Sequence, residues 1–237
     1  MAACLFVACG QTQKNKENVE TNVPEAEKLI ALSFDDGPNT TTTVKMLDML
    51  EKHGVVGSFF VIGNNINDSS AVVMKRAFDM GCDIQNHTWT HRNMAELSAE
   101  EIAEDYKKCD DLIVELTGKK ADFFRPPFIS INDTVYNTIK VPFVCGKACM
   151  DWDPNYDAEY RYQEIIQGAE NGTIYLLHVL EGNDATLKAL DRAIPELKEA
   201  GYEFVNLPDL FKATNTEPNI GESMWHVART GLGKRDR

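Results

Sequence analysis

The sequence has little positive charge and no long apolar run. It contains 24 Lys and Arg residues against 37 Asp and Glu residues, a net charge of −13. Because a nucleic-acid-binding surface needs a basic footprint, we expect no nucleic-acid partner. No stretch approaches the roughly 20 consecutive apolar residues of a membrane-spanning helix. The composition, 43% hydrophobic and 26% charged, is that of an ordinary globular protein, and 237 residues fit one α/β domain.

Cysteine is also scarce. None of the 6 cysteines belongs to a C-x-x-C pair, which argues against a zinc ribbon or a thioredoxin-like site. Four of them, Cys82, Cys109, Cys145 and Cys149, lie beyond the N-terminal segment. Their spacing leaves two alternatives open. An exported protein could pair Cys145 with Cys149 and Cys82 with Cys109, or all four could be buried free thiols.

The N-terminal segment predicts where the protein resides. Residues 1–10 are apolar and lack a basic residue, and residues 11–27 are polar, as in a flexible tether. Phe6-Val7-Ala8-Cys9 resembles the end of a bacterial lipoprotein signal. We therefore predict a protein exported to the bacterial periplasm or cell surface, with a lipid anchor on Cys9. The alternative is a disordered N-terminus with a chance cysteine.

Apolar strands alternate with helical segments along the rest of the chain. Strands are predicted over 28–34, 55–62, 82–85, 123–128, 141–145, 173–179 and 202–207. Helices are predicted over 40–53, 69–80, 98–116, 158–168 and 184–200. Ser98 and Glu101 form a capping-box signature, and Pro195 predicts a kink or break in the last helix. This alternation predicts a parallel sheet or an α/β barrel.

Polar residues of unusual kinds follow the ends of these strands. They are Asp35-Asp36, His87 with His91, Arg125, Asp151-Trp152 and His178. The two aspartates alone would fit a surface turn before Gly37-Pro38, although acids at the tip of a buried strand are costly unless their charge is used. In α/β barrels the chemistry lies at the carboxyl ends of the strands. The repeated coincidence therefore predicts one catalytic site.

The residue types suggest metal-assisted hydrolysis. His87 and His91 are four residues apart, so on a helical turn both imidazoles face the same side and can share a metal ion. With one carboxylate they form a ligand set with open positions, which suits a catalytic divalent ion. The second aspartate would take a proton from water, and His178 would protonate the leaving group. Arg125 would hold the basic aspartate by a charge-assisted hydrogen bond.

Five segments resemble, in order, the motifs of the polysaccharide deacetylases of carbohydrate esterase family 4, the NodB-homology domain. They are SFDDGP (33–38), HTWTH (87–91), RPPF (125–128), DW (151–152) and LLH (176–178). The resemblance covers about residues 28 to 210. It implies a distorted (β/α) barrel of about seven strands that binds a divalent metal, Zn²⁺ or alternatively Co²⁺, Mn²⁺ or Ni²⁺. The implied reaction removes N- or O-linked acetyl groups from a glycan, such as a GlcNAc-containing polymer, peptidoglycan or acetylated xylan.

The resemblance also implies catalytic roles. Asp35 would be the catalytic base, oriented by Arg125. His178 would be the general acid, tuned by Asp151. The implied metal ligands are Asp36, His87 and His91.

The remaining matched residues would contact the substrate. Trp152 and Leu176 would line the acetyl pocket, while Pro127 and Phe128 would shape the groove. The backbone N–H of Phe128 would contribute to the oxyanion hole. One departure concerns this groove, because Ile129-Ser130 follows Phe128 where the family usually has glycine.

These inferences divide the chain into three parts. Residues 1–27 are the signal remnant and tether, residues 28–212 the NodB-homology domain, and residues 213–237 a tail with no predicted element. Two other functions stay open. The altered third segment keeps a C–N hydrolase acting on a small non-sugar amide as an alternative. A non-catalytic glycan-binding lipoprotein would have lost a catalytic residue, and none is lost.

Overall fold

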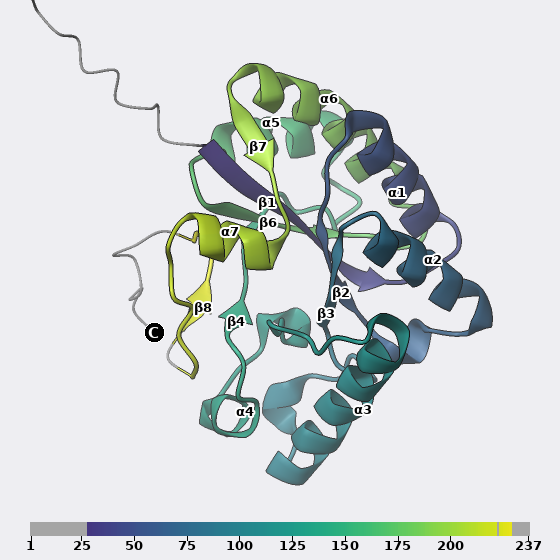
Figure 1. Cartoon of the computed structure of the whole chain (residues 1–237), viewed down its shortest axis with the longest axis vertical. Helices are drawn as coiled ribbons and strands as arrows, with labels where there is room; N and C mark the ends of the chain where they lie inside the picture. Colours follow the sequence, from purple (N-terminus) through teal and green to yellow (C-terminus); the bar gives the residue numbers. More distant parts are fainter. Residues whose placement is uncertain (1–27, 222, 229–237) are drawn as a thin grey trace, which may run out of the picture.

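The computed structural model describes residues 28–221 and 223–228, and its strands run through the centre of an α/β fold (Figure 1). The predicted lipid anchor at Cys9 lies outside the described residues, as does the end of the predicted tail. In the described part of the chain, no helix combines the length and apolar character needed to cross a membrane.

Six strands form one parallel sheet. Its order is β3-β2-β1-β6-β5, with β7 also paired to β1. The strands are β1 (Lys28–Gly37), β2 (Ser58–Val61), β3 (Asp83–Asn86), β5 (Lys147–Ala148), β6 (Thr173–His178) and β7 (Tyr202–Phe204). The predicted apolar runs explain the centre of this sheet, because residues 29–35 of β1 and 173–177 of β6 are buried. Asp35 therefore stands next to His178 in the register of two buried strands.

Short pairings close the sheet into a distorted barrel. Strand β4 (Phe143–Val144) lies within the strand predicted over 141–145. It pairs in parallel with β8 (Met224–Trp225), which lies in the tail where the sequence predicts no element. Phe124 bridges Asn86 on one side and Phe143 on the other, and Val227 bridges Thr173. The predicted strand over 123–128 is therefore wrong, since only Phe124 pairs. The two prolines that follow Arg125 have no N–H group for a ladder.

A glycine turns the chain from β4 into β5. Gly146 has φ of 100°, a conformation that side chains with a Cβ rarely adopt. A Cβ at this position would also lie 3.0 Å from the carbonyl oxygen of Ile174 and 3.0 Å from the amide nitrogen of Leu176. Glycine thus lets β5 pair closely with β6, whose last residue is His178.

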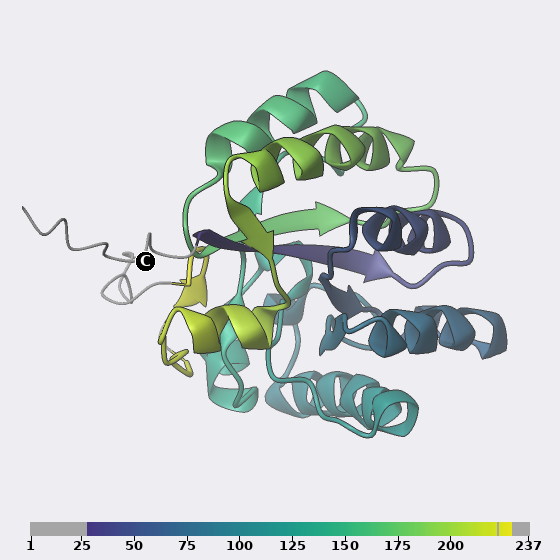
Figure 2. The same cartoon turned by 45° about the horizontal axis from the view of Figure 1, so that its top comes forward.

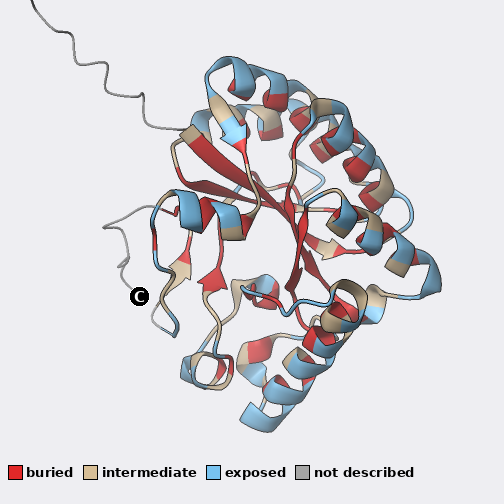
Figure 3. Ribbon diagram, viewed as in Figure 1, coloured by how far each residue is buried: buried red, intermediate tan, exposed pale blue. Residues whose placement is uncertain are grey.

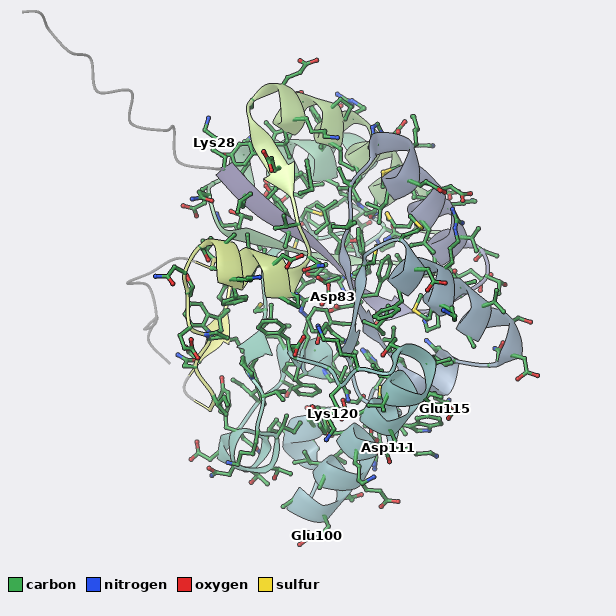
Figure 4. All side chains as sticks on the ribbon, in the orientation of Figure 1. Lys28, Asp83, Glu100, Asp111, Glu115 and Lys120 are labelled. Carbon is green, nitrogen blue, oxygen red and sulfur yellow. The ribbon has the colours of Figure 1, made fainter. Side chains whose placement is uncertain are left out.

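Helices surround the strands, as Figure 2 shows from a second direction. They are α1 (Thr42–His53), α2 (Asp68–Asp79), α3 (Ala99–Thr117), α4 (Asp133–Thr138), α5 (Ala158–Gly168), α6 (Asp184–Glu199) and α7 (Leu207–Ala213), with 3₁₀ turns η1 (Gly63–Asn65), η2 (Met94–Glu96) and η3 (Pro127–Ile129). Their inward faces are buried and their outward faces exposed (Figure 3). In Figure 4, Glu100, Asp111 and Glu115 lie on α3, whereas Asp83 lies among the strands.

Two sequence signals in the helices have different outcomes. Ser98 and Glu101 make both hydrogen bonds of a capping box, which confirms the predicted start of α3. Of the kink or break predicted at Pro195, the break does not occur, because α6 continues through Pro195 to Glu199.

The cysteines of the described chain are buried free thiols. Cys82, Cys109, Cys145 and Cys149 form no disulfide, so the disulfide alternative is wrong. Burial raises the pKa of Cys82 to about 11 and that of Cys109 to about 12. Both therefore remain protonated and unreactive at neutral pH.

Candidate active site

A bulge at the end of β1 directs two neighbouring carboxylates toward one site. Regular strand alternation would send Asp35 and Asp36 to opposite faces of the sheet. The pairing of β1 with β2 shifts register between Phe34 and Gly37, and Asp36 has φ of 68°. Such a bulge re-aims a side chain. Asn65 of η1 secures it by donating its side-chain N–H to the carbonyl oxygen of Asp36 at 2.9 Å.

The two histidines of the second motif lie on a loop between β3 and η2. The expectation that they share a helical turn is wrong, because Thr88 has φ of 73° and His91 has φ of 57°. Their rings nevertheless meet, with centroids 4.9 Å apart. The conformation of the loop, and not a helical turn, therefore brings the two imidazoles together.

Asp36, His87 and His91 form a cluster that fits a metal ion. Their candidate ligand atoms all lie within 4.8 Å of one another. Oδ1 of Asp36 is 3.4 Å from Nε2 of His87 and 3.1 Å from Nε2 of His91. This oxygen is buried and has no hydrogen-bond partner among the described residues. A buried, unpartnered carboxylate oxygen is costly, so a cation between the three groups would satisfy it.

Electrostatics keeps Asp36 in the form that a metal needs. Burial by itself would raise the pKa of Asp36, but the imidazoles of His87 and His91 outweigh it and hold the pKa well below its usual range. The tautomer of His87 is also set. Its Nδ1 lies 2.6 Å from the carbonyl oxygen of Arg125, which can only accept, so Nδ1 carries the proton. Nε2 is therefore the ring nitrogen that can ligate a metal ion beside Asp36.

Asp35 is held by a buried arginine. Arg125 is fully buried and donates from Nη1 to Oδ1 of Asp35 at 2.6 Å and from Nη2 to Oγ of Ser33 at 2.8 Å. Its Nε donates to the carbonyl oxygen of Val144 at 3.2 Å, and the guanidinium lies 4.1 Å from the ring centroid of Phe60. The other oxygen of Asp35, Oδ2, is 3.8 Å from Nε2 of His87. One carboxylate oxygen is thus fixed while the other faces the metal cluster.

An acid–imidazole pair, Asp151 with His178, stands beside the pair of Asp35 and Arg125. Oδ1 of Asp151 is 2.7 Å from Nδ1 of His178, and Oδ2 accepts the backbone N–H of His178 at 2.7 Å. Burial alone would lower the pKa of His178, but the hydrogen bond and charge of Asp151, followed by the charges of Asp35 and Asp36, raise it. Because Asp151 occupies Nδ1, the ring directs Nε2 outward as a potential proton donor.

The predicted substrate-contacting residues differ in exposure. Trp152 is 45% exposed, and its ring meets that of His178 edge-on, with centroids 5.5 Å apart. Phe128 is 69% exposed, and its ring centroid lies 4.8 Å from that of His91. Leu176 and Pro127 are buried. Leu176 lies two residues before His178 on β6 and therefore faces the same side of the strand.

Several residues that support the site were not predicted from the sequence. Thr186 of α6 donates its hydroxyl to Oδ2 of Asp151 at 3.1 Å, and Arg161 of α5 donates to Thr186 at 2.8 Å. Asp105 of α3 accepts hydrogen bonds from the histidine loop. A signal for Asp105 exists, because it shares the buried stripe of α3 with Ile102, Cys109 and Ile113. An acid in an apolar stripe indicates a buried partner.

A parallel α/β barrel that carries an acid–imidazole pair and a cluster suited to a metal ion near its strand ends is typical of barrel hydrolases. Comparison with known proteins makes the class specific. The family model described as polysaccharide deacetylase matches residues 22–141. The chain therefore belongs to the polysaccharide deacetylase family, with the α/β barrel that the resemblance implies.

Individual relatives agree with this family. A bifunctional xylanase/deacetylase of Pseudobutyrivibrio xylanivorans is 38% identical over 224 residues, which cover 94% of this chain and 37% of that protein. A peptidoglycan-N-acetylmuramic acid deacetylase of Bacillus subtilis is 35% identical over 191 residues, covering 78% of this chain and 72% of that protein. The chain thus spans little more than a third of the first relative.

A solved structure is also similar. The family 4 acetyl xylan esterase from Clostridium thermocellum, in complex with a cobalt ion, matches with a TM-score of 0.80 and 36% sequence identity. The match covers 86% of this chain and 100% of that chain. At this identity and coverage, the likeness extends over the whole barrel.

Proposed function

We propose that this protein is a metal-dependent hydrolase that removes acetyl groups from an acetylated glycan. The observation that carries the proposal is the meeting of two acid–base pairs at one metal-binding cluster. Asp35 is held by Arg125 at 2.6 Å, His178 is held by Asp151 at 2.7 Å, and the Asp36 cluster adjoins Asp35. Family membership of the chain supports the same reaction.

The proposed metal ligands are Asp36, His87 and His91. One carboxylate and two imidazoles with open positions suit a catalytic divalent ion, and imidazole favours Zn²⁺, Co²⁺ or Ni²⁺ over Mg²⁺. We propose Zn²⁺ as the native ion, with Co²⁺, Mn²⁺ or Ni²⁺ as alternatives. When bound, such an ion supplies a Lewis acid that polarises the acyl carbonyl and lowers the pKa of water.

The protein's own residues then supply the proton transfers. Asp35 accepts a proton from the attacking water at Oδ2, because Arg125 already occupies Oδ1. His178 donates a proton from Nε2 to the leaving oxygen or nitrogen of the sugar. Asp151 orients that imidazole and raises its pKa against the effect of burial, which favours the protonated form. A positioned acid and base of this kind each contribute about 10²–10⁴-fold to the rate.

The proposed substrate contacts surround this pair. Leu176 lies on the face of β6 that carries His178, and we place it with Trp152 against the acetyl methyl group. We also propose Phe128 and Pro127 as substrate contacts; the Phe128 ring lies beside that of His91. We propose acetylated xylan as the first candidate glycan, since the first relative is named a xylanase/deacetylase and the solved structure an acetyl xylan esterase. Peptidoglycan is the second, since another relative is a peptidoglycan deacetylase.

We further propose that the protein is exported to the bacterial periplasm or cell surface and anchored through Cys9. The support is the resemblance of residues 6–9 to the end of a lipoprotein signal. A glycan polymer as substrate fits that location.

The experiment that tests the function measures acetate release by Zn²⁺-loaded protein from acetylated xylan, N-acetylated glucosamine oligomers, peptidoglycan and small non-sugar amides. His87→Ala is the matched control. Release from a glycan that is lost in His87→Ala supports the proposal. Acetate release from the small amides alone would replace the proposal with the C–N hydrolase alternative. No acetate release from any substrate, with metal bound, would overturn the proposal.

A further inference from the structure

We propose that Asp105 is a positioning residue that holds the loop between His87 and His91 in its metal-binding conformation. The inference rests on the proposed metal-dependent function and concerns a residue outside the five matched segments. Asp105 lies in the middle of α3 (Ala99–Thr117) and is 5% exposed.

The side chain of Asp105 binds the loop at the two residues between Thr88 and His91. Its Oδ1 accepts the backbone N–H of Trp89 at 2.6 Å and that of Thr90 at 3.1 Å. Its Oδ2 accepts the hydroxyl of Thr90. Arg92, immediately after the loop, places Nη2 3.5 Å from the same oxygen. Hydrogen bonds to a carboxylate are stronger than neutral ones, so one buried acid organises the loop from both its main chain and its side chains.

The loop needs such support because its backbone is strained. Thr88 has φ of 73° and His91 has φ of 57°. For residues with a Cβ, such conformations are strained and persist only when surrounding contacts impose them. Within the loop, the hydroxyl of Thr88 accepts the backbone N–H of His91 at 2.9 Å. Asp105 supplies the contacts from outside.

The other side of the loop rests on η1. The backbone N–H groups of Gly63 and Asn64 donate to the carbonyl oxygens of Thr88 and Trp89, each at 3.0 Å. The Trp89 ring packs so closely on Gly63 that a Cβ there would lie 2.4 Å from it. The loop is therefore held between η1, which binds its carbonyl groups, and α3, where Asp105 binds its N–H groups.

The position of His91 depends on these contacts with η1 and α3 more than that of His87 does. The His87 ring is buried and fixed by its own hydrogen bond to the carbonyl oxygen of Arg125 at 2.6 Å. The His91 side chain is 23% exposed, and no hydrogen bond from the described residues reaches its Nδ1. Apart from the contacts with Asp36 and His87 within the ligand cluster, its ring position follows from the loop backbone and from the edge contact with Phe128. Loosening the loop should misplace one of the three proposed ligands.

The test measures Zn²⁺ affinity of the metal-free full chain by competition with a chromophoric chelator. The variant is Asp105→Asn, which keeps the shape of the side chain but presents an amide N–H to the N–H donors of the loop. Asp110→Asn is the matched control, because Asp110 is also a buried acid of α3 but accepts the N–H of Ala121 at 3.1 Å instead. Changes around metal-binding residues typically cost about 10–100-fold in affinity. We expect a loss of this size in Asp105→Asn and none in Asp110→Asn.

A second readout separates positioning from general destabilisation. The visible absorption of the Co²⁺-loaded protein should change in Asp105→Asn, while Asp105→Glu, which retains both carboxylate oxygens, should recover part of the Zn²⁺ affinity. Asp105→Glu is the deciding variant if Asp105→Asn does not fold. Unchanged affinity and spectrum, or an equal loss in Asp110→Asn, would overturn the inference. Because no substrate is involved, a failure of the proposed deacetylation would appear separately, as tight metal binding without acetate release.

Discussion

The buried pair of Asp35 and Arg125 leads to a quantitative prediction. The Arg125 side chain is 0% exposed and the Asp35 side chain 3% exposed, with 2.6 Å between Nη1 and Oδ1. Arg125→Met keeps an apolar chain over Phe60 but leaves the carboxylate buried and unpaired. Removing one partner of such a pair costs about 3–5 kcal/mol in the free energy of unfolding. For a domain of this size, that loss corresponds to a fall in Tm of roughly 6–20 °C.

The assay is urea denaturation of the metal-free protein for wild type, Arg125→Met, Asp35→Asn and the double variant. The double variant should recover much of the stability lost in Arg125→Met, because neither buried charge remains. It should stay inactive, because the proposed base is absent. A loss below about 1 kcal/mol in Arg125→Met, the size expected of an exposed pair, would refute the reasoning. The reasoning would also be refuted if adding Asp35→Asn to Arg125→Met did not recover stability.

Two further predictions concern pH. In the wild type, the charge of Asp151 outweighs burial and raises the pKa of His178. Because Asp151→Asn removes that charge, the alkaline limb of the kcat/KM profile, where His178 loses its proton, should move to lower pH. A limb that does not move would exclude His178 as the acid. Burial raises the pKa of Asp83 from 3.8 to about 6, so folding disfavours its ionised form, and stability should fall by about 3 kcal/mol as the pH rises from about 4 to about 6. Denaturation of Asp83→Asn over this pH range should lack that component, and an identical pH slope in both proteins would contradict the assignment.

The sequence predicts those elements whose signals are local. The capping box at Ser98 and Glu101 marks the start of α3, and the apolar run ending at His178 corresponds to β6. Two of the strands that it misses depend on distant partners, whereas the short helices α4 and α7, which it also misses, carry local caps at Asn132 and Asn206. Strands β5 and β8 have two residues each and exist because they pair with β6 and β4. Such short segments carry no periodicity of their own.

The same distinction applies to the site. Strand-end positions and the family resemblance identify the residues, and the structure brings Asp35, Asp36, His87, Arg125 and His178 together. The means by which they meet could not be predicted. The bulge that turns Asp36 depends on a register shift against β2, and the histidine loop depends on contacts with α3 and η1. Neither leaves a pattern in the residues that it positions.

The most direct test of the central claim measures bound metal and acetate release in the same preparations of wild type and His87→Ala. The wild type should hold one Zn²⁺ per chain and release acetate from an acetylated glycan. His87→Ala should lose both while keeping its fold, since only one of three proposed ligands is removed. Metal at full stoichiometry in His87→Ala, or undiminished acetate release from metal-free protein, would contradict the account.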